Sequence, residues 1–322
     1  MAAEPQRPVD AEQILAGNRR ALAKAITLVE STREDHRREA DVLMEAVLPH
    51  TGRSIRIGVS GVPGVGKSTF IEAFGLHLLR QGHRLAVLAV DPSSPVAGGS
   101  ILGDKTRMER LSREDAAFIR PSPSSGALGG VAHRTRESLL LCEAAGFDVI
   151  LVETVGVGQS EYEVAELVDF FLVLMLPNAG DELQGIKRGI MELADALVIN
   201  KSDGESAGLA ARTRQHYENA LHLLRHGDGW TPRVLCCSAL ENHGIDAVWE
   251  MIGDFRREAE ATGTMASRRA RQNGAWLRRL IAELLEQRFR SDPQVKAELP
   301  RLEQQVLRGE LTPRAAARRL LP

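Results

Sequence analysis

The sequence is poor in the residues that mark secreted, metal-binding and membrane proteins. Its 322 residues include three cysteines, whose spacing fits neither a disulfide framework nor a zinc site. The formal net charge of −2 gives no overall attraction to nucleic acid or membrane. The longest apolar run, FFLVLML at 170–176, is far shorter than the ~20 residues that cross a bilayer. The N-terminal residues include acids and no apolar core of signal-peptide type, so we expect a cytoplasmic protein that binds neither nucleic acid nor membrane.

Three regions of the chain differ in their hydrophobic pattern. Residues 1–50 repeat apolar side chains at helical spacing and predict an N-terminal helical extension. Residues 51–262 alternate short apolar runs with helical stretches, which predicts an α/β domain with a doubly wound, mostly parallel sheet. Strands are expected at 54–60, 84–90, 116–120, 147–153, 170–176, 195–200 and 232–237. Ligands of such sheets bind at the carboxyl ends of the strands.

Residues 263–322 lose the strand signal and predict a C-terminal helical arm. Between 265 and 322 there are 12 Arg and 1 Lys against 6 acids, a net charge of +7. Apolar residues form one stripe in this arm, at Trp276, Leu277, Leu280, Ile281, Leu284 and Leu285. This excess of basic residues has two interpretations. It could form a solvated helical face, or it could belong to an arm that docks on a second subunit or on an acidic partner. Nucleic acid is disfavoured, because no basic motif here is interleaved with aromatics.

A glycine-rich segment, GVSGVPGVGKSTF at 58–70, follows the first expected strand and opens a helix. It fits the pattern G-x-x-x-x-G-K-[ST]. Its glycines let successive N–H groups point at phosphate oxygens, and the helix adds its positive dipole end. Lys67 would place its charge between the β- and γ-phosphates, and the Ser68 hydroxyl would bind Mg²⁺. The alternative is a glycine-rich turn without a ligand. The nucleotide-binding residues predicted here are Gly61, Val62, Pro63, Gly64, Val65, Gly66, Lys67, Ser68 and Thr69.

Two later motifs favour guanine as the base. An N-K-x-D pattern follows the strand expected at 195–200, and an S-A-L loop follows the one at 232–237. The Asp203 carboxylate can accept from both N1–H and the exocyclic amine of guanine, a donor pair that adenine lacks on that edge. Asp203 would also suit a helix N-cap. We expect GTP and GDP as ligands, held additionally by Asn200, Lys201, Asp203, Ser238, Ala239 and Leu240.

The strand expected at 147–153 ends in Glu153, in a D-x-x-G layout with glutamate in place of aspartate. An acid at this strand end can hold a magnesium-bound water, and its extra methylene suggests outer-shell contact with the metal. Gly156 would bring its N–H to the γ-phosphate, so that the following loop orders with GTP and relaxes after hydrolysis. The alternative for Glu153 is a surface charge at a strand terminus.

Two further acids follow the second expected strand. Asp91 ends that strand in LAVDPSS, where one class of P-loop GTPases brings an acid near the metal, so we assign it a magnesium role. Asp104 lies at the far end of a long Ser/Gly/Pro-rich loop, 91–104, and could either swing into the site or cap a helix. A loop of this length inside a compact domain is usually functional.

Taken together, GVSGVPGVGKSTF, AVDPSSP, GGSILGDKTRM, VETVGVGQSE, NKSDG and CSAL resemble the MeaB family over nearly the whole chain. These proteins are GTPase chaperones of adenosylcobalamin-dependent methylmalonyl-CoA mutase, also labelled kinases of an arginine/ornithine transport system. The resemblance implies a homodimeric GTPase of the signal-recognition/MinD-like class, whose nucleotide state gates cofactor delivery to the mutase. It also marks PNAGDELQGIK, at 177–187, as a further switch loop in which Asp181, Gln184 and Lys187 respond to the partner.

The expected reaction is slow hydrolysis of GTP to GDP and phosphate. Lys67, Glu153 and Mg²⁺ would serve the transferred phosphoryl group, and Lys187 or Asp104 would complete the site when a partner binds. Three alternatives remain open. A kinase would need an acceptor site, a nickel-inserting GTPase would need a Cys/His cluster, and an adaptor would hold GTP without hydrolysing it.

Overall fold

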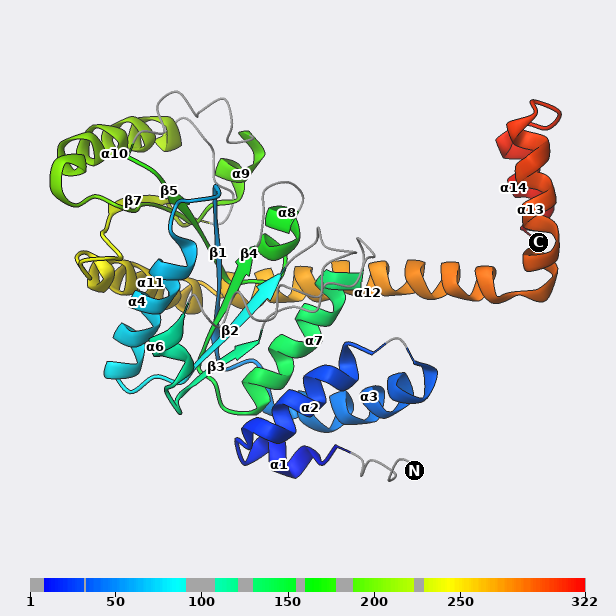
Figure 1. The fold of residues 1–322 in the computed structure, drawn as a ribbon, viewed down its shortest axis with the longest axis horizontal. Coiled ribbons are helices and arrows are strands. Elements are labelled where there is room, and N and C mark those ends of the chain that lie inside the picture. Colours follow the sequence, from blue (N-terminus) through cyan, green and yellow to red (C-terminus); the bar gives the residue numbers. More distant parts are fainter. Residues whose placement is uncertain are drawn as a thin grey trace. The chain divides into compact units, whose positions relative to one another are not determined.

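The computed structural model comprises two compact units, residues 1–268 and 269–322 (Figure 1). The described residues are 9–31, 33–90, 108–120, 130–154, 160–177, 188–222 and 229–321. The first unit is a parallel sheet flanked by helices, and the second is helical.

The sheet of the first unit has seven strands in the order β3-β2-β4-β1-β5-β6-β7, and all neighbouring pairs are parallel. The strands are β1 (Ile55–Gly61), β2 (Leu85–Val90), β3 (Ala117–Arg120), β4 (Val149–Thr154), β5 (Phe170–Met175), β6 (Ala196–Ile199) and β7 (Arg233–Cys236). Each overlaps one of the expected strands. The prediction of a doubly wound parallel α/β sheet is therefore confirmed.

Alternate residues of each strand enter two separate cores, one on each face of the sheet. In β4, Ile150 and Val152 belong to one core, whereas Val149 and Leu151 belong to the other. The first core is covered by α1 (Ala11–Leu15), α2 (Arg19–Val29), α3 (Glu34–Val47), α7 (Gly130–Ala144), α8 (Ser160–Ala165), α9 (Arg188–Leu193) and α10 (Ala207–His222). The second is covered by α4 (Lys67–Arg80), α6 (Glu109–Ser112) and α11 (Ile245–Ala261). Burial on both faces explains why the strands read as continuous apolar runs.

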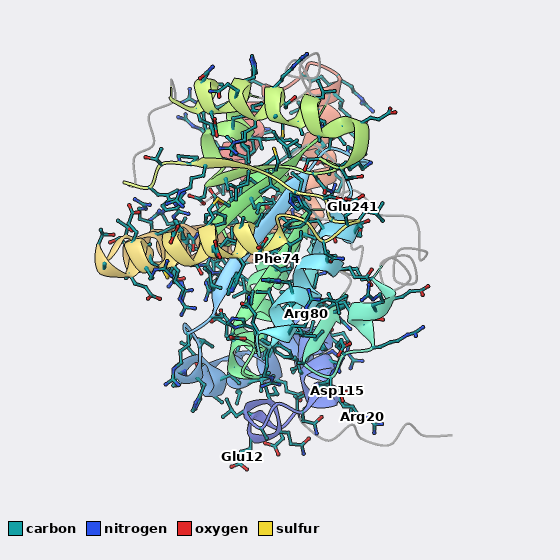
Figure 2. The ribbon with its side chains drawn as sticks, turned by 90° about the vertical axis from the view of Figure 1, so that its left-hand side faces the viewer. Glu12, Arg20, Phe74, Arg80, Asp115 and Glu241 are labelled. Atoms are coloured by element: carbon teal, nitrogen blue, oxygen red, sulfur yellow. The ribbon has the colours of Figure 1, made fainter. Side chains whose placement is uncertain are left out.

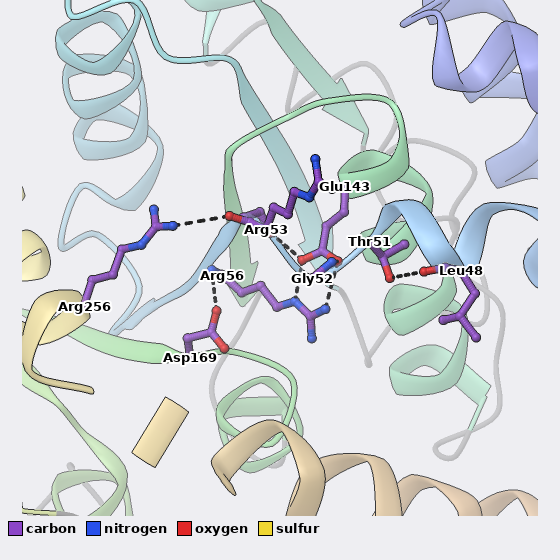
Figure 3. Close-up of polar contacts among 9 residues, drawn as sticks. Leu48, Thr51, Gly52, Arg53, Arg56, Glu143, Asp169 and Arg256 are labelled. Carbon is purple, nitrogen blue, oxygen red and sulfur yellow. Dashed lines mark hydrogen bonds and ion pairs between the residues drawn. The ribbon is translucent and has the colours of Figure 1, made fainter. Parts of the chain in front are cut away.

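A buried ion pair closes the amino-terminal edge of the sheet (Figure 3). The guanidinium of Arg56 in β1 donates to both carboxylate oxygens of Glu143 in α7, from Nε at 2.9 Å and from Nη2 at 3.0 Å. Glu143 also accepts from the Ser54 hydroxyl and from the Gly52 N–H. The Arg56 N–H donates to Asp169, just before β5, at 2.9 Å. These contacts hold α7 and β5 to the beginning of β1.

Helix α12 (Thr264–Ser291) continues into the second unit, which also holds α13 (Pro293–Leu307) and α14 (Pro313–Leu320). Helix α13 packs on α14 around Leu302 and Ala316, which are buried. The Asp292 side chain caps α13 by accepting from the N–H of Gln294 at 2.7 Å. Among the described residues, no helix combines the length and the apolar character that a membrane span requires.

Candidate nucleotide-binding site

Residues 61–68, which we call the phosphate loop, join β1 to α4 at the carboxyl edge of the sheet. Gly61, Gly64 and Gly66 have φ angles of 151°, 78° and 92°, a region that favours glycine. A Cβ at Gly61 would lie 2.6 Å from the carbonyl oxygen of Leu174, so close packing against β5 also requires glycine there. The loop therefore has the curled backbone that turns N–H groups inward around an anion.

Lys67 is the first residue of α4, and its ammonium group contacts the beginning of the phosphate loop. Its Nζ donates to the carbonyl oxygen of Gly61 at 2.8 Å. Ser68 and Thr69 follow in the first turn of α4, where the orphan N–H groups and the helix dipole favour a negative ligand. The structure thus brings the charge, the hydroxyls and the helix end predicted from the sequence to one loop.

Asn200, directly after β6, joins the phosphate loop to the loop after β7. Its Nδ2 donates to the carbonyl oxygen of Val65 at 2.9 Å, and its Oδ1 accepts from the N–H of Ala239 at 3.1 Å. Asn200 is only 2% exposed, so these bonds are shielded from water. A Cβ at Gly66 would lie 2.8 Å from the same Nδ2. The three predicted nucleotide motifs therefore meet at one amide side chain.

The rest of the N-K-x-D motif lies around the same loop. Lys201 has a φ of 58°, and its Nζ donates to the carbonyl oxygen of Gly64 at 2.7 Å. The Ser202 hydroxyl donates to the carbonyl oxygen of Cys237 at 2.7 Å. Asp203 is half-buried and precedes the 3₁₀ turn Gly204–Ser206. Its side chain makes no capping hydrogen bond there, so the helix-cap alternative does not account for this carboxylate.

The S-A-L loop is a tight antiparallel turn. Ser238 and His243 exchange both backbone hydrogen bonds, and the Ser238 hydroxyl accepts from the N–H of Glu241. Leu240 is 78% exposed at the tip. Figure 2 shows Glu241 near the beginning of α4, with Phe74 and Arg80 successively farther along the helix. The turn therefore lies at the edge of the sheet that carries the phosphate loop.

Glu153 lies in β4 beside β1 and pairs with Val59, two residues before the phosphate loop begins. It is 4% exposed, so a surface charge at a strand end does not describe it. The next residue, Thr154, donates from its hydroxyl to that of Ser60 at 3.0 Å. This buried bond holds the end of β4 to the end of β1. Neither Ser60 nor Thr154 could be predicted as a site residue from the sequence, because an S/T pair in neighbouring strands forms no motif.

Four predicted site residues, Asp91, Asp104, Gly156 and Lys187, lie outside the described residues, as do Asp181 and Gln184. Their assigned roles remain predictions.

The paired cysteines belong to the β7 region rather than to a metal cluster. Cys237 is fully buried, and burial raises the pKa of its thiol to about 12. Cys236 ends β7 and is half-buried. Within the described ranges, no group of three or more His, Cys, Asp or Glu side chains is arranged to hold a metal ion.

Comparison with known proteins gives one family over most of the chain. The family model described as "Methylmalonyl Co-A mutase-associated GTPase MeaB" matches residues 22–294. A putative GTPase of Caulobacter vibrioides is 57% identical over 96% of this chain and 95% of its own length. The methylmalonic aciduria type A homolog of Mus musculus, a mitochondrial protein, is 49% identical over 96% of this chain and 77% of its own.

One solved structure agrees with the fold. A crystal structure of a LAO/AO transport system kinase is 42% identical, with a TM-score of 0.77 over 99% of this chain and 98% of that one.

Proposed function

We propose that this chain, which belongs to the MeaB family of GTPases, is a GTP-dependent chaperone of an adenosylcobalamin-dependent methylmalonyl-CoA mutase. The chain is a P-loop GTPase by family and by fold. The mutase as partner is supported by the description of the family and by the name of the mouse relative. One structural observation supports the proposal most directly: the Asn200 side chain hydrogen-bonds to both the phosphate loop and the loop after β7, and so joins them in one site.

The described residues suit GTP and Mg²⁺. The N–H groups of the phosphate loop and the Lys67 ammonium would bind the β- and γ-phosphates, and the Asp203 carboxylate would select guanine. The Ser68 hydroxyl and the buried Glu153 carboxylate, next to β1, are oxygen donors of the kind that Mg²⁺ takes. When bound, Mg²⁺ would neutralise charge on the phosphate oxygens. Glu153 would act through a metal-bound water, and Asp91 is a further proposed magnesium contact.

Slow hydrolysis in the free protein follows if water positioning is incomplete. Phosphoryl transfer depends mostly on positioning and electrostatics, so one side chain moved by a partner can change the rate by orders of magnitude. We assign this role to Lys187 or Asp104, and we assign Gly156 to the γ-phosphate. The test is GTP turnover with and without the mutase. Stimulation that persists unchanged in both Lys187→Ala and Asp104→Ala would exclude that assignment.

The second unit supports a homodimer. Along α12, Leu277, Ile281, Leu284 and Leu285 are each about half exposed or more, at 58%, 48%, 60% and 62%. An uncovered apolar stripe of this kind favours association, and a second copy of the arm would cover it. Sedimentation velocity tests this. The wild type should sediment as a dimer, whereas Ile281→Glu should give monomers, because it places a charge in the middle of the stripe.

A cytoplasmic location and a role independent of nucleic acid and membrane are part of the same proposal. The kinase alternative is tested by following labelled γ-phosphate. Release as free phosphate supports the GTPase reaction, whereas transfer to an acceptor supports a kinase.

A further inference from the structure

We propose that Tyr162 is a positioning residue, which places α9 by packing its phenol against Gly189. The inference rests on the proposed function, because it concerns how α9 responds to the bound nucleotide. Lys187 immediately precedes α9 in the sequence, and Gly189 lies in the first turn of that helix.

The contact leaves no room for a side chain at position 189. A Cβ built on Gly189 would overlap the Tyr162 hydroxyl oxygen and would lie 2.9 Å from Cζ of the same ring. Gly189 is helical and is not among the glycines with a positive φ, so its backbone conformation does not require glycine. Glycine inside a helix is unfavourable relative to alanine. While the phenol stays in this contact, alanine at position 189 would force it to move aside.

The two helices follow the two strands that flank β1. Helix α8 comes after β4, and α9 comes after β5, and β1 lies between these strands in the sheet. Helix α8 is seated directly on β1, because a Cβ at Gly58 would lie 3.0 Å from Cγ1 of Val164. Helix α9 contacts α8. Tyr162 in α8 thus fixes the position of α9 relative to β1, the strand that leads into the phosphate loop.

The contact can be released without unfolding the core. Tyr162 is 44% exposed, whereas Val164, two residues later in α8, is fully buried. The phenol can therefore leave Gly189 while α8 remains on the sheet. A packed contact of this kind has discrete engaged and released arrangements. When it is engaged, α8 and α9 are held to each other at Tyr162 and Gly189.

The experiment compares four variants of the full-length chain with the wild type. Gly189→Ala inserts a methyl group against the phenol, Tyr162→Ala removes the ring, and the double variant removes ring and clash together. Gly208→Ala is the matched control, because Gly208 is also a helical glycine but a Cβ there meets nothing within 4 Å. Hydrogen exchange of the α9 amides is measured with GDP and with a non-hydrolysable GTP analogue, and calorimetry gives both affinities.

In the wild type and in Gly208→Ala, exchange of the α9 amides should differ between the two nucleotide states by roughly 3- to 30-fold, the range in which coupling residues act. In Gly189→Ala and Tyr162→Ala this difference should vanish. GDP affinity should stay within about twofold of the wild type, because both residues lie in helices outside the phosphate loop. The double variant should match Tyr162→Ala rather than add the two effects.

Two results would overturn this inference and leave the proposed function intact. One is α9 amide exchange that still differs between the nucleotide states in both single variants. The other is no such difference in a wild type that binds nucleotide. No guanine nucleotide binding in the wild type would instead overturn the proposed function. If Gly189→Ala does not fold, Tyr162→Phe in the same background provides the second test. Removing the hydroxyl, the atom nearest to the new methyl, should restore folding and part of the coupling, and no restoration would contradict the contact.

Discussion

The side-chain amide of Asn200 donates to the carbonyl oxygen of Val65 at 2.9 Å, although the two residues are 135 positions apart in the chain. The same side chain accepts from Ala239. One buried amide therefore fixes the geometry of the phosphate loop relative to the base-reading loops.

Asn200→Ala should lower both stability and nucleotide affinity. It leaves the carbonyl of Val65 and the N–H of Ala239 without their partner, and each unsatisfied buried group costs about 1–3 kcal/mol. Thermal unfolding without nucleotide measures the first effect, and calorimetry with GDP measures the second. Asn219→Ala, on the surface of α10, is the control. An unfolding temperature equal to that of the wild type would contradict the joining role of Asn200.

Asp203→Asn should weaken GTP and GDP binding by about 10- to 100-fold, the value of one hydrogen bond to a charged group. The amide keeps the shape of the carboxylate but presents a donor to the guanine N1–H. Binding of xanthosine triphosphate, whose base carries a carbonyl acceptor in place of the exocyclic amine of guanine, should be less affected or improved. Asp115→Asn is a fully exposed control. Equal GTP affinity in Asp203→Asn and the wild type would remove Asp203 from base recognition.

Gly66→Ala should lose more stability than Gly82→Ala. The two glycines have nearly the same φ, 92° and 88°, so alanine meets a similar backbone strain of about 1–2 kcal/mol at both. Only at Gly66 would the methyl also meet the Asn200 amide, at 2.8 Å, since a Cβ at Gly82 meets nothing within 4 Å. Chemical denaturation of both variants measures the difference. Equal losses would mean that the amide moves aside without cost.

Glu143→Gln should destabilise the protein by about 3–5 kcal/mol at neutral pH, because it leaves the buried Arg56 charge without its partner. Burial opposes ionisation of Glu143, but hydrogen bonds from Arg56, Ser54 and Gly52 outweigh it and hold its pKa below the usual 4.5. A lowered folded-state pKa gives stability that is present above the unfolded-state pKa and lost as the pH falls through the folded-state value. The wild type should thus lose stability below about pH 4.5 more steeply than Glu143→Gln.

Glu34→Gln provides the control for that pair, because Glu34 also pairs with an arginine but is 81% exposed. Its loss should stay below about 1 kcal/mol. The two variants behaving alike in denaturant titrations would contradict the role of burial.

The sheet could be predicted from the sequence because most of its seven strands are short apolar runs, and a parallel sheet covered on both faces needs such runs. The phosphate loop could be predicted equally well, because a fixed local pattern contains Gly61, Gly66, Lys67 and Ser68. The N-K-x-D and S-A-L motifs could be placed after their strands for the same reason. In each case the information is local, within about ten residues.

What could not be predicted are contacts between distant segments. Nothing near Asn200 in the sequence indicates that its amide would bond to Val65. Arg56 stands in an apolar strand, and its partner Glu143 is 87 positions away. The packing of Tyr162 on Gly189 likewise depends on the strand order β4-β1-β5, which no local pattern specifies. These contacts are consequences of topology, and so they appear only in the folded chain.

The most direct test of the central claim is calorimetric titration of the protein with GTP-analogue and ATP-analogue in the presence of magnesium. The site described here, with Asp203 reading the base and the phosphate loop holding the phosphates, predicts that guanine nucleotide binds at least about 10⁴-fold more tightly. Equal affinity for the two nucleotides, or no binding of either, would contradict it.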